Sequence, residues 1–251
     1  MIDSVERFSN RVENYVKYRP HYPGEIIGYL SKTIGLTPET LIADIGCGTG
    51  ISSRLFLENG NEVIGVEPNA AMRAAAAEYL SEFPRFTLIN GTAEGTTLAD
   101  DSVDVVLAGQ AFHWFDLAKT KPEFKRILAP GGHVVLMWNE RQLDTTPFLI
   151  EYEQFLVKYS TDYSVVRHDR FDEKVLAEFF DTGVKKAVFA NVQRVDLDGL
   201  KGRMLSASYM PSEQDDVYPQ MLHELASLFA KHSESDRINI LYDTNVYVSQ
   251  G

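Results

Sequence analysis

LIADIGCGTG, residues 41–50, is an apolar run that ends abruptly in a glycine-rich turn. Its three glycines, Gly46, Gly48 and Gly50, stand at alternate positions and let the backbone adopt a left-handed conformation close to a ligand. A residue with a Cβ would cost about 1–2 kcal/mol in that conformation. The following residues, 51–59, are predicted to form a helix whose first N–H groups and positive dipole end face the turn. A strand, a glycine turn and a helix in this order predict a nucleotide-type site.

The spacing of the glycines indicates which kind of nucleotide the turn accepts. A dinucleotide fingerprint has glycine at its first, third and sixth positions, whereas the sixth position here is Ile51. This spacing disfavours an NAD-dependent dehydrogenase, which remains an alternative. A second predicted strand, 62–66, is followed by Glu67, whose carboxylate could accept hydrogen bonds from both hydroxyls of a ribose. Pro68 comes next and keeps Glu67 extended at the tip of the strand.

The length and composition favour one globular domain. A chain of 251 residues can bury roughly 70–75% of its unfolded surface, enough for one core with a smaller appended lobe. No apolar run approaches the ~18 residues of a membrane span, and residues 1–4 lack the basic and apolar regions of a signal peptide. We therefore expect a soluble, cytoplasmic protein that contacts no membrane.

Charge and cysteine content limit the possible partners. The formal net charge is −12, and Lys185 and Lys186 are only a pair, so the basic cluster on which nucleic acid binding depends is missing. We expect a small-molecule substrate and no nucleic acid partner. The single cysteine, Cys47, has no partner for a disulfide, which agrees with a reducing compartment. Its place in the glycine turn favours packing over a catalytic thiol, and no metal site is expected.

Helices and strands alternate through the first half of the chain and give way to helices with a final pair of strands. The predicted helices cover residues 25–34, 52–59, 69–79, 116–128, 148–159, 171–180 and 221–231. The predicted strands cover residues 40–45, 62–66, 86–90, 103–108, 133–138, 186–195 and 240–248. The first strands are apolar and separated by helices, as in a parallel sheet that is buried on both faces.

Three further segments have local signatures. Apolar residues at helical spacing in residues 5–16, after a capping-box start, predict an N-terminal helix. Two prolines and a glycine within residues 20–24 predict a stiff elbow after it. The Ala-Pro-Gly-Gly run 129–132 predicts a turn between the helix 116–128 and the fifth strand. The last two strands are expected to pair antiparallel and complete the sheet.

Three motifs together resemble a known family. They are DIGCGTG at 44–50, GVEP at 65–68 and QAFHWF at 110–115. As a set they resemble a class I S-adenosylmethionine-dependent methyltransferase, in the small-molecule branch that includes trans-aconitate methyltransferase, and the likeness covers most of residues 10–137. It implies an α/β fold, Rossmann-like, in which a seven-stranded mostly parallel sheet has helices on both faces and an antiparallel last strand. It also implies N-terminal lid helices within 1–35, a cofactor-binding core at 36–138, and a small helical cap with the closing strands at 139–251.

The resemblance implies S-adenosylmethionine as cofactor and S-adenosylhomocysteine as product. The glycine turn would hold the amino acid end, Glu67 the ribose, and the exit of the third strand the adenine. Thr92 departs from the acidic residue that relatives often carry there, and Ala93 could serve through its backbone instead. The residues expected to bind the cofactor are Tyr18, Arg19, Asp44, Gly46, Cys47, Gly48, Gly50, Glu67, Pro68, Thr92, Ala93, Glu94 and Gln110.

Four residues are candidates for contact with the reacting groups. Arg19 could clamp a carboxylate of the cofactor or of the substrate, or it could form a surface ion pair. His113 could be a general base, although a structural histidine that is hydrogen-bonded behind the cofactor is the preferred interpretation. Arg203 and Tyr209 could hold an acid or a hydroxyl, or they could be ordinary helix and loop residues. The same choice applies to Ser206 and Ser208, and the neighbours Trp114 and Phe115 are expected in the core or in the cofactor pocket wall.

Methyl transfer to a small molecule is the function that these observations favour. The Asn/Asp-Pro-Pro-aromatic motif of nucleic acid base methylation is absent from the sequence. We expect transfer from S-adenosylmethionine to a carboxylate or hydroxyl oxygen, in which the protein mainly positions the reactants. The alternative is a non-catalytic protein of the same fold that binds S-adenosylmethionine or S-adenosylhomocysteine.

Overall fold

A computed structural model describes residues 17–160, 173–181, 183–207 and 209–250. The predicted helix at 5–16, the first two residues of the predicted helix at 171–180, and Ser208 lie outside the described residues. Within the described ranges, no helix is long and apolar enough to cross a membrane.

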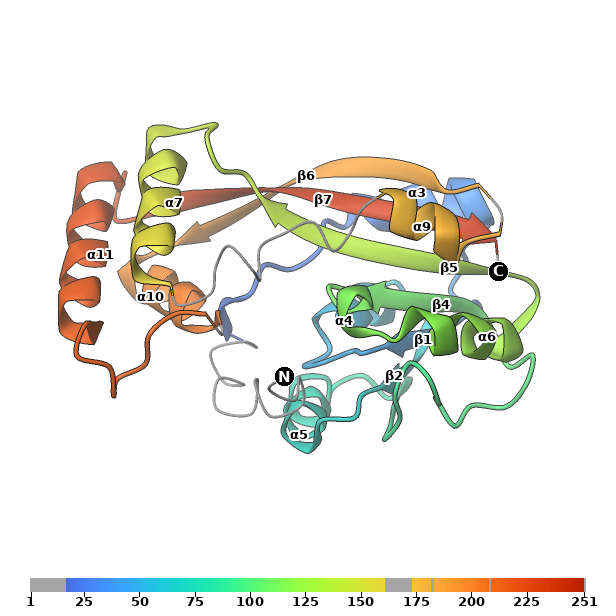
Figure 1. Ribbon diagram of the computed structural model, residues 1–251. Coiled ribbons are helices and arrows are strands. Elements are labelled where there is room, and N and C mark those ends of the chain that lie inside the picture. The colour runs from blue at the N-terminus through green and yellow to red at the C-terminus, as the bar shows by residue number, and fades with distance from the viewer. Residues whose placement is uncertain (1–16, 161–172, 182, 208, 251) are drawn as a thin grey trace.

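A seven-stranded sheet organises the molecule, as predicted (Figure 1). Its strands are β1 (Leu41–Ile45), β2 (Glu62–Val66), β3 (Phe86–Ile89), β4 (Val103–Gly109), β5 (Leu128–Arg141), β6 (Lys185–Val195) and β7 (Ile238–Gln250). Their order in the sheet is β3-β2-β1-β4-β5-β7-β6. The first five strands are parallel to one another, and β7 is antiparallel to both of its neighbours, β5 and β6.

Helices cover both faces of this sheet because the strand side chains alternate between two apolar clusters. On one face, Ile42 of β1 packs with α3 (Glu25–Ile34) and α4 (Ile51–Glu58). On the other face, Ala43 and Ile45 belong to a cluster with α6 (Leu117–Ile127) and α9 (Glu173–Phe179). The strand is therefore buried on both sides, which is the pattern expected for the centre of a parallel sheet.

A smaller helical lobe stands at one end of the sheet. The strands β5, β6 and β7 run well beyond the parallel strands and carry α7 (Pro147–Tyr159), α10 (Leu197–Leu205) and α11 (Tyr218–His232) at their far end (Figure 1). These helices share a core of their own with the ends of β6 and β7, which includes Leu149, Leu200, Leu225 and Tyr242. We refer to this lobe as the cap.

Two predicted details differ from the structure. The run 129–132 does not separate the helix from the fifth strand, because β5 begins at Leu128 and continues through it. Gly131 has a φ of 84°, and the register against β4 shifts between Val103 and Val105, so the turn is an irregularity within the strand. The second difference is α10, which lies in a stretch where we predicted no regular element.

Candidate functional site

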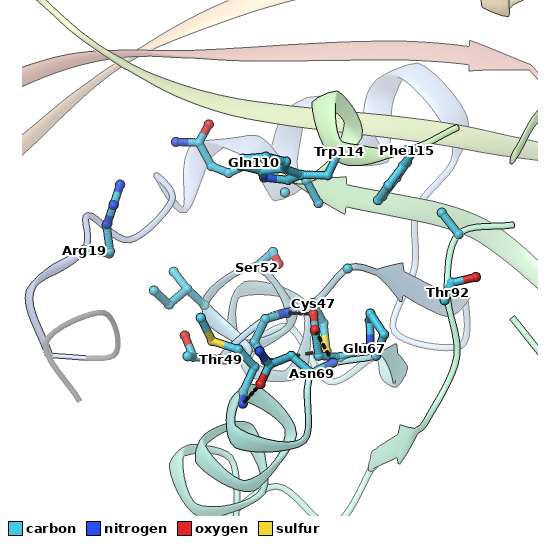
Figure 2. Close-up of a pocket in the computed structure, with 18 of the residues that line it drawn as sticks. Arg19, Cys47, Thr49, Ser52, Glu67, Asn69, Thr92, Gln110, Trp114 and Phe115 are labelled. Carbon is cyan, nitrogen blue, oxygen red and sulfur yellow. Dashed lines mark hydrogen bonds between the residues drawn. The ribbon is translucent and has the colours of Figure 1, made fainter. Parts of the chain in front are cut away.

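A cavity of about 330 Å³ lies at the carboxyl ends of β1, β2 and β4 (Figure 2). This is the edge of an open α/β sheet at which ligands bind. In Figure 2, Cys47, Thr49 and Asn69 lie on one side of the cavity, and Gln110 and Trp114 face them from the other. Arg19 stands at one end and Thr92 at the opposite end.

The glycine turn forms the first wall. Gly46, Gly48 and Gly50 have φ angles of 68°, 56° and 85°, as their sequence pattern predicts. A Cβ on Gly46 would lie 2.8 Å from the Cβ of Ala111, whereas a Cβ on Gly48 would meet no atom within 4 Å. Gly50 is the N-cap of α4, and as a glycine it has no side chain with which to cap the helix. The N–H of Ser53 is bonded to the carboxylate of Asp44, whereas Ile51 and Ser52 line the cavity, so the positive end of the helix lies beside it.

Glu67 lines the cavity at the end of β2 and also braces the glycine turn. Its Oε2 accepts the N–H of Gly48 at 3.0 Å, and its Oε1 accepts the N–H of Asn69 at 2.8 Å. Burial raises the pKa of this carboxyl, while the two backbone hydrogen bonds and Arg73 act in the opposite direction. Each carboxylate oxygen can accept a second hydrogen bond, so both remain able to meet ligand hydroxyls.

Asp44, predicted to bind the cofactor, does not line the cavity. It is fully buried behind the turn, and its Oδ2 accepts the hydroxyls of Ser52 at 2.7 Å and Ser53 at 2.6 Å. Burial raises the pKa of Asp44 to about 6, although both serine hydroxyls lower it. The structure therefore places this carboxylate as a brace for the start of α4.

The exit of β4 forms the opposite wall. Gln110 has a φ of 57°. Its backbone N–H donates to the carbonyl of Met137 at 3.0 Å, and its side-chain Nε2 donates to the carbonyl of Asn139 at 3.2 Å. Gly109 permits a close approach here, since a Cβ would lie 2.8 Å from the Cβ of Ser52 and 2.9 Å from the hydroxyl oxygen of Tyr22. A left-handed non-glycine residue at a cavity wall is the kind of strained position that often marks a functional site.

The exit of β3 lies at the end of the cavity that Thr92 marks. Thr92 and Gly95 exchange backbone hydrogen bonds of 3.2 Å, which form a tight turn. Ala93 and Glu94 also line the cavity, and the Oε1 of Glu94 accepts the N–H of Asp116 at 2.8 Å. Trp114 and Phe115, which were expected in the core or in the cofactor pocket wall, line the same cavity.

The structure brings most of the predicted cofactor residues together. Those that line the cavity are Arg19, Gly46, Cys47, Gly48, Glu67, Pro68, Thr92, Ala93, Glu94 and Gln110. Tyr18, Asp44 and Gly50 are not among the lining residues. The thiol of Cys47 is buried, and burial raises its pKa, which agrees with a packing role.

The candidates for the reacting groups are dispersed. Arg19 lines the cavity, and its Nη2 donates to the carbonyl of Ser206 at 3.0 Å. His113 does not line the cavity, and its ring packs against Trp114 and Trp138 at centroid distances of 4.5 and 5.0 Å. The role of His113 as a structural histidine remains a prediction. Both candidates in the cap also lie outside the lining, where the Nε of Arg203 donates to the hydroxyl of Tyr242 at 3.1 Å and Tyr209 packs against the cap core.

Several lining residues were not singled out by the sequence. They are Tyr22, Thr49, Ser52, Asn69, Met72 and Asn139. Thr49 lies inside the quoted motif, and Asn69 follows GVEP as the N-cap of α5 (Ala70–Tyr79), so proximity to a motif could have identified these two. Asn139 carries no such signal, because it reaches the cavity through the course of β5.

The cavity fits a nucleoside with an amino acid tail. Its volume lies within the range of about 300–1,000 Å³ that is usual for small-molecule sites. Thr49 is 1% exposed, and its Oγ1 has no hydrogen-bond partner among the described residues. At the glycine turn, the space beside Gly48 is open to a ligand. The hydroxyl of Thr49 and the carboxylate oxygens of Glu67 supply polar contacts there. Among the described residues, no group of histidine, cysteine or acidic side chains is arranged to hold a metal ion.

Comparisons with known proteins find methyltransferases. Residues 43–136 match a family model described as a methyltransferase domain. A methyltransferase-like protein of Schizosaccharomyces pombe is 26% identical over 250 residues, which covers 98% of this chain and 96% of that protein. An uncharacterised methyltransferase of Mycobacterium bovis is 38% identical over 134 residues, 53% of this chain and 52% of its own length. The crystal structure of a protein described as a type II methyltransferase of Anaeromyxobacter dehalogenans superposes with a TM-score of 0.71 at 21% identity, covering 93% of this chain and 98% of that one.

Proposed function

We propose that this protein, whose residues 43–136 match a methyltransferase domain, is a class I S-adenosylmethionine-dependent enzyme that methylates a small organic acid or hydroxylated metabolite on oxygen. The observation that carries the proposal is the composition of the cavity at the carboxyl ends of β1, β2 and β4. One part of this cavity contains the glycine turn and the carboxylate of Glu67, and one end contains the guanidinium of Arg19.

When bound, S-adenosylmethionine supplies a methyl group that is already activated by the positive sulfur. The residues of the chain then have to bind and orient. The N–H groups at the start of α4 and the hydroxyl of Thr49 are placed for the carboxylate of the amino acid tail, and Glu67 for the ribose hydroxyls. Alignment of two reactants in this way can contribute on the order of 7–11 kcal/mol to lowering a barrier.

Arg19 supports an acidic acceptor. Its guanidinium lies at the cavity end opposite Thr92 and close to the C-terminal end of α10, where it donates to Ser206. A carboxylate acceptor needs no general base, and the described lining of the cavity contains no histidine. We therefore assign binding of the acceptor carboxylate to Arg19 and a packing role to His113. In a chain with a net charge of −12, such a cation is needed to offset repulsion of an acid.

Incubation of the purified protein with methyl-labelled S-adenosylmethionine tests the proposal. The acceptor panel should contain carboxylic acids, phenols, aliphatic alcohols and an RNA. Label in a base-labile ester or a stable ether would support O-methylation, and label only in RNA would overturn it. Tight cofactor binding without transfer to any member would instead favour the non-catalytic alternative.

A further inference from the structure

One wall of the cavity is formed by a short segment that precedes α3. Arg19, Pro20 and Tyr22 of this segment, residues 18–22, line the cavity. Pro20 has no N–H to donate to a strand ladder, and residues 19–23 belong to no strand of the sheet. Its position over the cavity must therefore be fixed by other contacts.

Side-chain amides of β6 take the place of a strand ladder. The Nε2 of Gln193 donates to the carbonyl of Tyr18 at 2.8 Å, and the Nδ2 of Asn191 donates to the carbonyl of His21 at 2.7 Å. These two residues stand at alternate positions and share one face of the strand, whereas Val192 between them points to the other face and is 56% exposed.

Asn139 on β5 extends this set of amides into the cavity. Its Nδ2 lies 3.4 Å from the carbonyl of Pro20 and 3.3 Å from that of His21, and its Oδ1 accepts from Asn191 at 3.1 Å. The hydroxyl of Thr244 on β7 donates to the same Oδ1. The backbone carbonyl of Asn139 also accepts from the Nε2 of Gln110, so the buried residue Asn139 connects the segment with the exit of β4.

We propose that Asn139, Asn191 and Gln193, which we call the amide strip, are positioning residues that hold segment 18–22 against the cavity and thereby place Arg19. The proposal rests on the function proposed above, because the segment matters only if the cavity binds the cofactor and acceptor. An amide suits Asn139 and Gln193 because the NH₂ group of each donates to the segment while its oxygen accepts from a hydroxyl of β7, and the NH₂ group of Asn191 donates both to the segment and to Asn139. Neither an acid nor an apolar side chain at these positions can do both.

The double variant Asn191→Asp, Gln193→Glu tests the inference. Both side chains keep their size, but each loses its donor and places a carboxylate against a backbone carbonyl. Because both positions lie on the edge strand and are only half-buried, we expect the variant to fold. We expect S-adenosylhomocysteine to bind at least tenfold more weakly, chiefly through faster dissociation in stopped-flow measurements, and amide hydrogen exchange to accelerate in segment 18–22.

Val192→Glu is the matched control. It adds a carboxylate to the same strand on the opposite face, and we expect wild-type affinity and exchange. Wild-type affinity in the double variant, or an equal loss of affinity in the Val192→Glu protein, would overturn the inference. If the unaltered protein failed to bind S-adenosylhomocysteine, the proposed function would fall, whereas faster exchange confined to segment 18–22 would still support the amide strip.

Discussion

Glu67 is the residue on which cofactor binding should depend most directly. Its two oxygens accept backbone N–H groups while facing the cavity, and a glutamine would keep the size but place an NH₂ group against one of those donors. A hydrogen bond to a charged group contributes about 1.5–3 kcal/mol, so we expect Glu67→Gln to weaken S-adenosylhomocysteine binding about ten- to over a hundredfold in calorimetry. Glu62→Gln, at an exposed position on the same strand, should bind normally. Equal affinity of all three proteins would argue against the ribose assignment.

Asp44 should make stability depend on pH. Its pKa of about 6 in the folded protein lies above the ordinary 3.8, so between these values the folded state holds a proton that the unfolded state releases. Stability should therefore fall as pH rises from about 4 to 6, by at most about 3 kcal/mol. The pKa of Glu67 is raised as well, so Glu67 adds to the fall of stability with rising pH. Asp44→Asn should flatten the dependence of the urea midpoint on pH across this range, and an unchanged slope would exclude Asp44 as its cause.

Local motifs revealed the residues whose roles are set by the backbone around them. Gly46, Gly48 and Glu67 could be identified because a left-handed turn and a strand tip restrict residue type within a few positions. Asn139 could not, since its partners are carbonyls of residues 20 and 21, far away in the sequence. Arg203 shows the converse, because its residue type predicted an acid clamp while the fold places it in the cap beside Tyr242.

At the scale of elements, Gly48 and Gly50 are required for different reasons, Gly50 for packing and Gly48 for access of a ligand. A Cβ on Gly50 would lie 2.5 Å from the Cδ1 of Leu80 in addition to adopting a φ of 85°, whereas a Cβ on Gly48 would enter open space. We expect Gly50→Ala to lower the free energy of unfolding by more than the 1–2 kcal/mol of left-handed strain alone. Gly48→Ala should lose only about that strain but should weaken S-adenosylhomocysteine binding. Denaturation and calorimetry on both variants will test this ordering.

In the helix α10, a glycine-to-alanine substitution is expected not to give the usual gain in stability. Replacing a helical glycine by alanine normally stabilises a protein by up to about 1 kcal/mol. A Cβ on Gly202 would collide with the ring of Tyr18, so we expect Gly202→Ala to give no gain and to weaken S-adenosylhomocysteine binding by displacing segment 18–22. Gly28→Ala on α3, where a Cβ meets no atom within 4 Å, should be stabilising and bind normally. A stabilised Gly202→Ala protein with normal affinity would contradict this packing.

The regular elements were predictable where periodicity was strong. The helix at 25–34 and the strand at 62–66 have the predicted bounds, because their apolar positions and flanking glycines give clear signals. The run 129–132 was wrongly predicted as a turn, since pairing with β4 carries the backbone through two glycines. The helix α10 was missed because it contains two glycines, which local propensity alone disfavours.

At the scale of the whole molecule, a buried ion pair joins the sheet to the cap. Arg141 at the end of β5 pairs with Glu153 on α7, and the two side chains are only 10% and 15% exposed. Removing one partner of a buried pair commonly costs about 3 kcal/mol or more. We expect Arg141→Met to lower the free energy of unfolding by about that amount in urea titrations, and Arg141→Met with Glu153→Met to recover most of it. A single variant as stable as the wild type would show that the pair does not hold the cap.

The architecture of the sheet followed from the sequence, whereas the acceptor region did not. Alternating strands and helices limit the core to a few topologies, and the final strands could be placed as an antiparallel pair. The acceptor end of the cavity draws its residues from segment 18–22, the exit of β4 and β5, which meet only after the chain has folded. No local pattern specifies which of their side chains will face one another.

The position of β7 has a consequence for how the chain matures on the ribosome. This strand is made after β6, yet it lies between β5 and β6 in the sheet. Until β7 emerges, β6 has no neighbour with which to pair, and the amides that it contributes cannot be held beside the cavity. The parallel half can therefore form during synthesis, but the wall over the binding site can form only after β7 has been translated.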